Sequence, residues 1–337
     1  MRPNFIRFLL FFVLMIMAFT HNAQILPSFG NSRTGTTGFQ FLKIYPDARS
    51  SGMAGSVVSF TNDLSSVYWN PAGLTFLDSN RLHFQFGHTA YFAGTSLNYA
   101  AASFTHNYLN FWAFHAISFS TPDMPVTTEF NPEGNGLNYK AGDFLASLSF
   151  AKILSENFSF GLNAKFILED IAGIKTYNGL FDIGFVYNIG FSRKTRFAVS
   201  ISNFGFNVSP KGKVVVSTLN GDKILENFEN IAVPAIFRMG IATQVWQKGP
   251  HSLSACTQLT HPTDNNETAS VGVEYVYRKF LKIRSGYEFG SDLQSLPTAG
   301  IGIFLPRYFG NMSVDYGFNA RDYFGNTHRI TVGFSLK

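Results

Sequence analysis

Apolar and polar residues alternate with a period of two along most of the chain from residue 80 onward. In one such run the apolar positions are Phe158, Phe160, Leu162, Ala164 and Phe166. The positions between them are small, polar or charged. Because successive side chains of a strand point to opposite faces of a sheet, this pattern predicts strands with one face suited to lipid and one suited to a lumen.

Fourteen runs of this kind are present. They begin near residues 80, 95, 109, 142, 157, 177, 195, 234, 251, 267, 281, 297, 309 and 327. Most have ~10 residues, enough to cross a bilayer at a tilt, and the number is even, as bacterial single-chain barrels require. We therefore predict an all-β fold, a transmembrane antiparallel β-barrel of about 14 strands over residues 79–337, with a last strand at Arg329–Lys337 that closes it. The run Leu109–Ser120 fits least well, because its aromatic residues do not keep one parity.

Two connections are much longer than hairpin turns and fall on the side predicted to face outward, Thr121–Ala141 and Val208–Val233. The turns predicted on the other side are short, and this asymmetry is typical of outer-membrane barrels. Apolar residues in the long connections suggest docking of another protein. The candidate docking residues are Met124, Val126, Phe130, Val215, Ile224, Leu225 and Phe228. Asn220-Gly221 predicts a hairpin between Val214–Ser217 and Lys223–Glu226, which either projects or folds over the barrel as a lid.

The first residues have the features of an export signal. Arg2 and Arg7 precede an apolar run, Phe8–Phe19, that is too short to span a bilayer. We predict a signal peptide over residues 1–23 and a mature chain that starts near Gln24. This predicts export from the cytoplasm and a location in the outer membrane.

Residues 24–78 have too few apolar groups to fold alone, and we predict that they form a plug inside the barrel. Within it, residues 47–53 are expected to form a helical turn that ends at Gly52, and Val57–Phe60 a short strand. Leu64–Trp69 is expected to be a second helix that stops before Pro71.

Composition agrees with a membrane barrel. Of 337 residues, 45% are hydrophobic and only 14% are charged, against ~25% in soluble domains. After residue 23 no run of ~20 apolar residues is present, which excludes a helical membrane protein. The strands of a large soluble β-sandwich would also alternate apolar and polar residues. The outer face of such a sandwich, however, would be richer in Lys, Glu and Thr and poorer in Gly.

The sequence contains no recognisable catalytic constellation. The eight histidines form no HExxH helix, and neither a CxxC pair nor a phosphate-binding glycine loop occurs. We therefore predict no enzymatic activity, no cofactor and no metal site. The net charge is +5, but Lys and Arg are scattered, so nucleic-acid binding is not expected. Cys256, the single cysteine, is expected to be a small buried group.

Charged residues on the parity that faces the lumen suggest a network that holds the plug. The carboxylates are Asp182, Glu274, Glu288 and Asp315, and the cations are Lys165, Arg238, Arg284 and Arg329. We prefer this structural role to an ion-translocation path.

The plug region contains a distinctive turn, Asn70-Pro71-Ala72-Gly73. Pro71 fixes its own φ and biases Asn70 away from helix, and Gly73 permits an unusual φ. Together with the preceding run from Phe41 to Gly55 and the strand pattern that follows, residues 39–76 resemble the amino-terminal segment of the PorV/PorQ family of Bacteroidetes outer-membrane proteins. These are relatives of FadL-type barrels, in which an Asn-Pro-Ala-Gly turn lies in the plug.

The resemblance implies a component of the type IX protein secretion system. Members similar to PorV bind the carboxyl-terminal signal domains of exported cargo, and associate with the large translocon barrel and an attachment complex. The alternative is a FadL-like channel for hydrophobic small molecules, with a lipid or hydrophobic ligand in the lumen. Because barrels host both tasks, the fold alone does not separate these hypotheses.

Overall fold

The structure, a computed structural model, describes residues 34–78, 82–127, 131–189, 194–218, 221–291, 294, 296–307, 310–322 and 324–336. The predicted signal peptide, residues 1–23, and the candidate docking residue Phe130 lie outside these ranges. Both therefore stay predictions.

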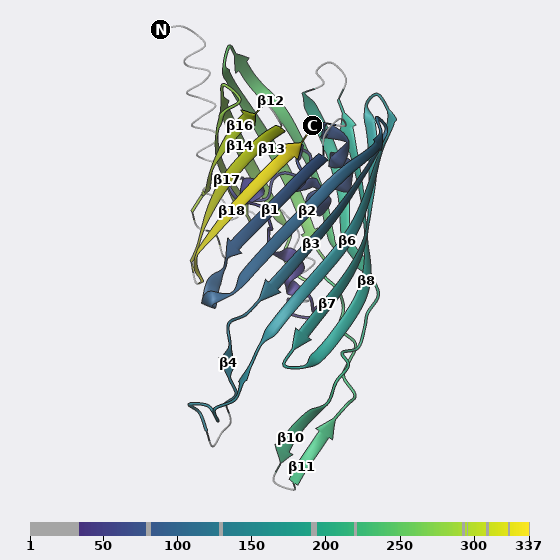
Figure 1. Cartoon of the computed structure of the whole chain (residues 1–337), viewed down its shortest axis with the longest axis vertical. Coiled ribbons are helices and arrows are strands. Elements are labelled where there is room, and N and C mark those ends of the chain that lie inside the picture. The colour runs from purple at the N-terminus through teal and green to yellow at the C-terminus, as the bar shows by residue number, and fades with distance from the viewer. Residues whose placement is uncertain are drawn as a thin grey trace.

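Fourteen antiparallel strands of the described chain form one closed barrel (Figure 1). They are β1 (Leu82–Ala90), β2 (Ser96–Asn107), β3 (Asn110–Ser120), β6 (Ala141–Ser155), β7 (Phe158–Ile171), β8 (Ile174–Asn188), β9 (Thr195–Gly205), β12 (Ile236–Lys248), β13 (His251–Pro262), β14 (Thr268–Tyr277), β15 (Leu281–Phe289), β16 (Thr298–Arg307), β17 (Gly310–Arg321) and β18 (Gly325–Leu336). Each strand pairs with its neighbours along the chain, and β18 pairs with β1 from Leu82↔Leu336 to Ala90↔His328. The predicted fold class is confirmed, and so is closure by the last strand.

Two small hairpins lie outside the barrel. β4 (Met124–Pro125) pairs with β5 (Asn138–Tyr139), and β10 (Val214–Thr218) pairs with β11 (Gly221–Leu225). Both extend beyond the same end of the strands, and the second projects along the barrel axis instead of lying across the mouth as a lid (Figure 1). We call this the outer end and the opposite one the periplasmic end, because long loops of outer-membrane barrels face outward.

The outer wall of the barrel is apolar. Large side chains exposed on it include Phe86, Phe104, Phe114, Leu148, Phe166, Phe181, Ile201, Val273, Ile303 and Ile330. The alternating residues face the lumen and are mostly small, polar or charged, as the period of two predicts. Some are apolar and pack in the core with the N-terminal segment, among them Leu97, Leu145, Ile167 and Leu180. Among the described residues, no helix is long and apolar enough to cross a membrane.

Strand β3 is apolar on both faces, which explains its irregular sequence pattern. Trp112 and Phe114 lie on the outward parity, while Phe111 and Ile117 are buried on the inward one. The inward face packs against residues of the N-terminal segment in one hydrophobic core. A strand that is buried on one side and faces lipid on the other needs no polar face.

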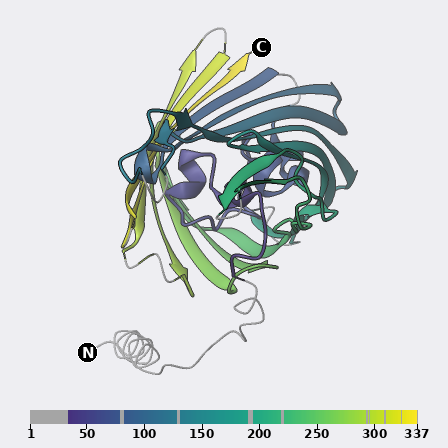
Figure 2. The same ribbon diagram turned by 90° about the horizontal axis from the view of Figure 1, so that it is seen from below.

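Residues 34–78, here called the luminal segment, run inside the barrel (Figure 2). The segment contains η2 (Gln40–Lys43), α2 (Ala48–Ser51), α3 (Ser66–Trp69) and η3 (Pro71–Phe76). The expected turn that ends at Gly52 and the expected helix before Pro71 correspond to α2 and α3. The Asp47 side chain caps α2 by accepting from the backbone N–H of Ser50.

The expected strand at Val57–Phe60 is wrong, because this stretch is a turn. The backbone N–H of Phe60 donates to the Val57 carbonyl at 2.8 Å. The N–H of Val58 donates to Gln258 Oε1 of the wall at 2.9 Å. A side chain of β13 therefore satisfies the backbone group that a strand partner would otherwise bind.

Candidate functional site

The predicted Asn70-Pro71-Ala72-Gly73 turn lies fully buried between the luminal segment and the wall. Asn70 Oδ1 accepts from the Ala72 N–H at 3.1 Å, and its Nδ2 donates to the carbonyls of Val58 and Phe185 at 3.3 and 3.1 Å. Pro71 opens η3, where its missing N–H leaves no donor unsatisfied. The turn thus joins two parts of the segment to strand β8.

Glycines on the inner wall allow the backbone of the segment to approach closely. A Cβ atom at Gly161 would overlap the backbone of Ala72, and one at Gly184 would overlap the side chain of Asn70. One at Gly286 would overlap the backbone of Met53. The abundance of glycine on the lumen-facing parity therefore reflects the fit between wall and segment.

Arg49 of α2 joins a buried charge network on the wall. Its Nη1 lies 2.8 Å from Asp63 Oδ2, and its Nε lies 3.3 Å from Glu274 Oε2. Arg284 contacts Glu274 at 2.7 Å and Asp315 at 2.6 Å. Burial alone would lower the pKa of Arg49, but the carboxylates raise it above its ordinary value.

Further predicted charges hold the segment or brace the wall beside it. Arg329 donates to the Tyr45 carbonyl at 2.9 Å and to Ser51 Oγ at 3.0 Å. Lys165 pairs with Asp182 at 2.6 Å on neighbouring strands. Glu288 and Arg238 differ from the prediction, because both line an outer cavity and neither takes part in a described ion pair.

The outer end of the segment is fixed to a loop of the wall. Asp264, in the β13–β14 connection, accepts from Lys43 Nζ at 2.9 Å, Gln40 Nε2 at 3.0 Å and Thr37 Oγ1 at 2.5 Å. Burial would raise the pKa of Asp264, but these hydrogen bonds lower it below 3.8.

An outer cavity of about 850 Å³ lies between the luminal segment and the barrel mouth. Apolar and aromatic side chains provide most of its surface. Those lining it include Phe39, Phe41, Ile44, Tyr45, Trp69, Tyr91, Phe92, Phe119 and Ile236. Arg238 is buried beside them, with its guanidinium 5.1 Å from the Trp69 ring and a hydrogen bond to Ser202 Oγ at 3.0 Å. Other charged side chains also line the cavity, namely Lys43, Asp143, Glu169, Glu288 and Arg321. This arrangement suits a mainly apolar ligand that also carries polar groups.

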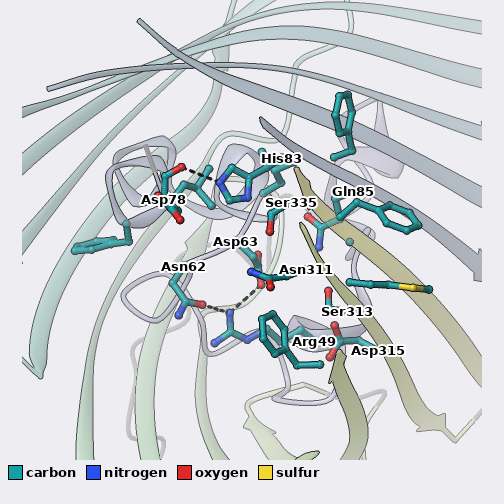
Figure 3. Close-up of a pocket in the computed structure, with 18 of the residues that line it drawn as sticks. Arg49, Asn62, Asp63, Asp78, His83, Gln85, Asn311, Ser313, Asp315 and Ser335 are labelled. Carbon is teal, nitrogen blue, oxygen red and sulfur yellow. Dashed lines mark hydrogen bonds and ion pairs between the residues drawn. The ribbon is translucent and has the colours of Figure 1, made fainter. Parts of the chain in front are cut away.

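A smaller cavity of about 290 Å³ lies at the periplasmic end (Figure 3). Its polar lining comes from the segment and from the strands beside the β1–β18 seam. The residues are Arg49, Asn62, Asp63, His83, Gln85, Lys282, Asn311, Ser313, Asp315 and Ser335. Leu77 and Phe304 add apolar surface.

The candidate docking residues are dispersed over the two outer hairpins. Val215 and Ile224 are paired across β10–β11 and are 61% and 58% exposed, and Leu225 is 39% exposed. Phe228, Met124 and Val126 are partly buried. Among the candidates that the structure describes, Val215 and Ile224 therefore lie together as an exposed pair.

The remaining candidates for chemistry have structural surroundings. Cys256 is buried 3.2 Å from Ser56 Oγ of the segment, so its prediction as a small buried group is confirmed. His251 packs between Tyr275 and Tyr277 near the periplasmic rim, where aromatic residues commonly line barrels. Within the described ranges, no group of three or more His, Cys, Asp or Glu side chains is placed to hold a metal ion.

Sequence reasoning missed both cavities. The outer one combines residues of the segment with strand ends that are far apart in the sequence, so no local pattern marks it. Lys282 of the periplasmic cavity lies on the predicted lumen-facing parity, which was an available signal. That signal does not show which lumen-facing groups lack partners.

No protein-family model matches the sequence, and no curated protein matches it. Several solved structures share the fold. The Ralstonia pickettii toluene transporter TbuX has 12% identity and a TM-score of 0.60, and the match covers 90% of this chain and 99% of that one. The CymD monoaromatic hydrocarbon channel has 15% identity and a TM-score of 0.54, covering 86% and 96%. A Pseudomonas aeruginosa FadL homologue has 12% identity and a TM-score of 0.55, covering 86% and 98%.

This chain has a FadL-like fold. The FadL-like barrel agrees with the predicted outer-membrane location, because its wall carries an apolar belt around a closed ring of strands. At 12–15% identity the likeness concerns the fold alone. The narrower resemblance of residues 39–76 to PorV/PorQ proteins stays a prediction.

Proposed function

We propose that this FadL-like barrel lies in the outer membrane and binds hydrophobic small molecules at its outer cavity, as the first step of their uptake. The observation that carries the proposal is the apolar lining that the segment and the barrel mouth build together. Cavities of several hundred Å³ with apolar walls and one or two polar groups are typical of small-molecule sites. Neighbours of the same fold include a protein described as a toluene transporter and one described as a monoaromatic hydrocarbon channel.

Trp69 offers a direct test, because it lines the outer cavity. The chain has three tryptophans, so the double variant Trp112→Phe, Trp246→Phe leaves Trp69 as the only one. We expect toluene to change its fluorescence emission saturably in detergent micelles. Absence of a saturable change would overturn the proposal.

Two matched substitutions locate the binding. Thr260 lines the cavity from β13, and the adjacent Leu259 faces outward and is 40% exposed. Thr260→Phe places a ring inside the cavity and should weaken toluene binding about tenfold, the effect of losing about 1.4 kcal/mol. Leu259→Phe adds a ring on the lipid-facing side and should leave binding unchanged. Equal effects of the two substitutions on toluene binding would indicate that toluene partitions into the micelle and does not bind in the cavity.

A second candidate function is the type IX secretion role that the PorV/PorQ resemblance implies. It is favoured by the exposed Val215–Ile224 pair on a hairpin that projects from the outer end (Figure 1). Exposed apolar side chains on an ordered projection suit contact with another protein. The partners would be cargo carboxyl-terminal domains, the translocon barrel or the attachment complex.

A pull-down from outer membranes separates the two candidates. The double variant Val215→Ser, Ile224→Ser removes the apolar pair. Phe206→Ser, which changes an exposed apolar residue outside the hairpin, serves as its control. Loss of co-purified secretion proteins in the first variant alone would support docking. If the double variant co-purifies the same secretion proteins as the unchanged protein, the hairpin is not their docking site.

A further inference from the structure

We infer that the periplasmic rim of the barrel between β8 and β15 binds the headgroup of an anionic phospholipid in the adjacent membrane leaflet. The rim presents unpaired positive charge directly beside aromatic rings of the outer wall. It lies at the opposite end of the barrel from the outer cavity. The inference therefore goes beyond the proposed function and does not depend on it.

Three neighbouring turns build this part of the rim, at the end opposite the projecting hairpins (Figure 1). They connect β8 to β9, β12 to β13 and β14 to β15. The Lys194 ammonium donates to Gln247 Oε1 at 2.7 Å, which joins the first turn to the second. The Arg278 N–H donates to the Pro250 carbonyl at 2.7 Å, which joins the second to the third. The three turns therefore form one continuous surface.

This surface is positive and carries no balancing carboxylates. Its sequence, residues 189–196, 246–252 and 276–282, contains no Asp or Glu. Within the described chain, its exposed cations take part in no ion pair. These cations are Lys194, Lys248, Arg278 and Lys279. They lie up to 85 positions apart in the sequence, so the cluster forms only in the folded barrel.

The outer end of the barrel has a different charge balance. Three of its exposed lysines lie beside carboxylates. The pairs are Lys140–Asp123 at 3.3 Å, Lys175–Asp170 at 3.6 Å and Lys213–Glu226 at 2.7 Å. Unpaired cations in one cluster attract an anion more strongly than cations that already have partners. The asymmetry therefore favours an anionic ligand at the periplasmic rim.

Outward-facing aromatic rings place these charges at the depth of lipid headgroups. Trp246 is 45% exposed, and His251 packs against Tyr275 and Tyr277. Trp and Tyr side chains favour the boundary between hydrocarbon and water. The Arg278 guanidinium lies 5.4 Å from the Tyr277 ring centre. The cations thus lie immediately beyond the aromatic belt, where the phosphates of a lipid leaflet begin.

The Arg278-Lys279 turn indicates that these side chains serve more than folding. The Phe280 N–H donates to the Tyr277 carbonyl at 2.9 Å, and φ is 51° at Arg278 and 58° at Lys279. This is a type I′ turn, whose two central positions favour Asn and Gly. The left-handed backbone costs energy at Arg and Lys. Folding alone would therefore favour other residues here, whereas binding of an anion accounts for two cations.

An anionic phospholipid uses every part of this surface. Its phosphate can accept hydrogen bonds from the lysine and arginine side chains. Its acyl chains can lie against the apolar wall beside the rim, where Val245 is 59% exposed and Ile189 is 41% exposed. A soluble anion would contact the cations but leave the aromatic belt and the apolar wall unused. We therefore assign the surface to a lipid.

Non-denaturing mass spectrometry of the full-length protein in detergent micelles tests the lipid. Phosphatidylglycerol is the probe, and phosphatidylcholine with the same acyl chains is the comparison without net charge. We expect phosphatidylglycerol to bind at least about tenfold more tightly, because several unpaired cations face its phosphate. Inorganic phosphate at the same concentration should not displace it, because phosphate alone makes no contact with the wall.

A double variant removes the charge without harming the turn. Arg278→Asn with Lys279→Gly, here called the turn variant, supplies the residues that a type I′ turn prefers. It should unfold at no lower denaturant concentration than the natural protein, yet bind phosphatidylglycerol about tenfold more weakly. Lys248→Gln, on the neighbouring turn, should weaken binding several-fold. Heat-modifiable migration on gels checks that every variant is folded.

A matched variant controls for net charge. Lys211 and Lys223 are exposed in the connection between β9 and β12, at the outer end. Lys211→Gln with Lys223→Gln removes the same two positive charges as the turn variant. Because this change lies far from the periplasmic rim, it should leave phosphatidylglycerol binding unchanged. An equal loss in both double variants would show that net charge, and not the rim, determines lipid binding.

Trp246 reports where the lipid binds. The double variant Trp69→Phe, Trp112→Phe leaves it as the only tryptophan. In mixed vesicles, phosphatidylglycerol with brominated acyl chains should quench its emission more than brominated phosphatidylcholine does. The turn variant should abolish that difference. Trp112, isolated by Trp69→Phe with Trp246→Phe, lies near the same end of the barrel on β3 and should show no preference.

The outcomes separate this inference from the proposed function. Equal affinity for the two lipids, displacement by inorganic phosphate, or unchanged binding in the turn variant would overturn the rim site. The response of Trp69 to toluene should persist in the turn variant, because the outer cavity lies at the other end of the barrel. Loss of that response with lipid binding intact would reject the outer cavity alone.

Discussion

At the residue scale, Arg49 connects the luminal segment to charges on the wall that lie more than two hundred positions later in the chain. Its side chain is 6% exposed, and Asp63 depends on it for charge compensation, whereas Glu274 also pairs with Arg284 at 2.7 Å. Removing one partner of a buried ion pair leaves the other charge uncompensated.

Arg49→Met should therefore lower the free energy of unfolding by about 3 kcal/mol or more, measured by denaturant titration in micelles. The control is Lys140→Gln, which breaks the exposed Lys140–Asp123 pair and should cost at most about 1 kcal/mol. Similar losses in the two variants would contradict a central role for Arg49.

Asp264 predicts a dependence on pH. Its hydrogen bonds with Thr37, Gln40 and Lys43 hold its pKa below 3.8 in the folded protein. A group with a depressed folded pKa adds stability above its unfolded pKa, and this stability is lost as the pH falls through the folded value. Protease cleavage near residue 37 should therefore increase below about pH 4. Asp264→Asn should show that susceptibility already at neutral pH, with little further change on acidification.

At the scale of elements, the luminal segment fills much of the space inside the strands (Figure 2). Its contacts with β7, β8 and β17 are backbone approaches at glycines, supplemented by buried hydrogen bonds. We predict that deletion of residues 24–75 leaves a barrel that conducts ions in a planar bilayer, whereas the intact protein does not. A deletion variant that inserts normally and remains closed would show that the segment is not the plug.

The strands were predictable because their signal is local. All wall strands except β3 alternate in parity, and even β8, whose start deviates most, begins at Ile174 instead of near residue 177. The strand predicted at Val57–Phe60 was wrong because the backbone of this stretch binds Gln258, 200 positions away. No local sequence pattern reveals such a contact. The candidate site depends on such distant contacts throughout. Parity placed Lys282 and Arg284 on the same face, but only the folded arrangement shows that Arg284 pairs with two carboxylates, Glu274 and Asp315.

At the scale of the whole molecule, the apolar belt determines how the barrel tolerates charge. Val273 lies on the outward face of β14 and is 44% exposed. Val273→Arg should destabilise the inserted barrel by about 2–4 kcal/mol, because an arginine near the bilayer midplane is poorly solvated. Phe206→Arg, beyond the end of β9 and 75% exposed, should have little effect. Refolding into vesicles in increasing denaturant measures both.

The path of the luminal segment also constrains how the protein assembles. The segment is paired with the wall at the outer end through Thr37 and Ala232, and it leads into β1 at the periplasmic end. A ring that had already closed would admit it only by threading a chain end along the full length of the lumen. The pairing of β1 with β18 joins positions 254 residues apart, such as Leu82 and Leu336, and so carries a high loop-closure cost. Assembly in which the other strands gather around the segment and this seam forms last avoids threading altogether.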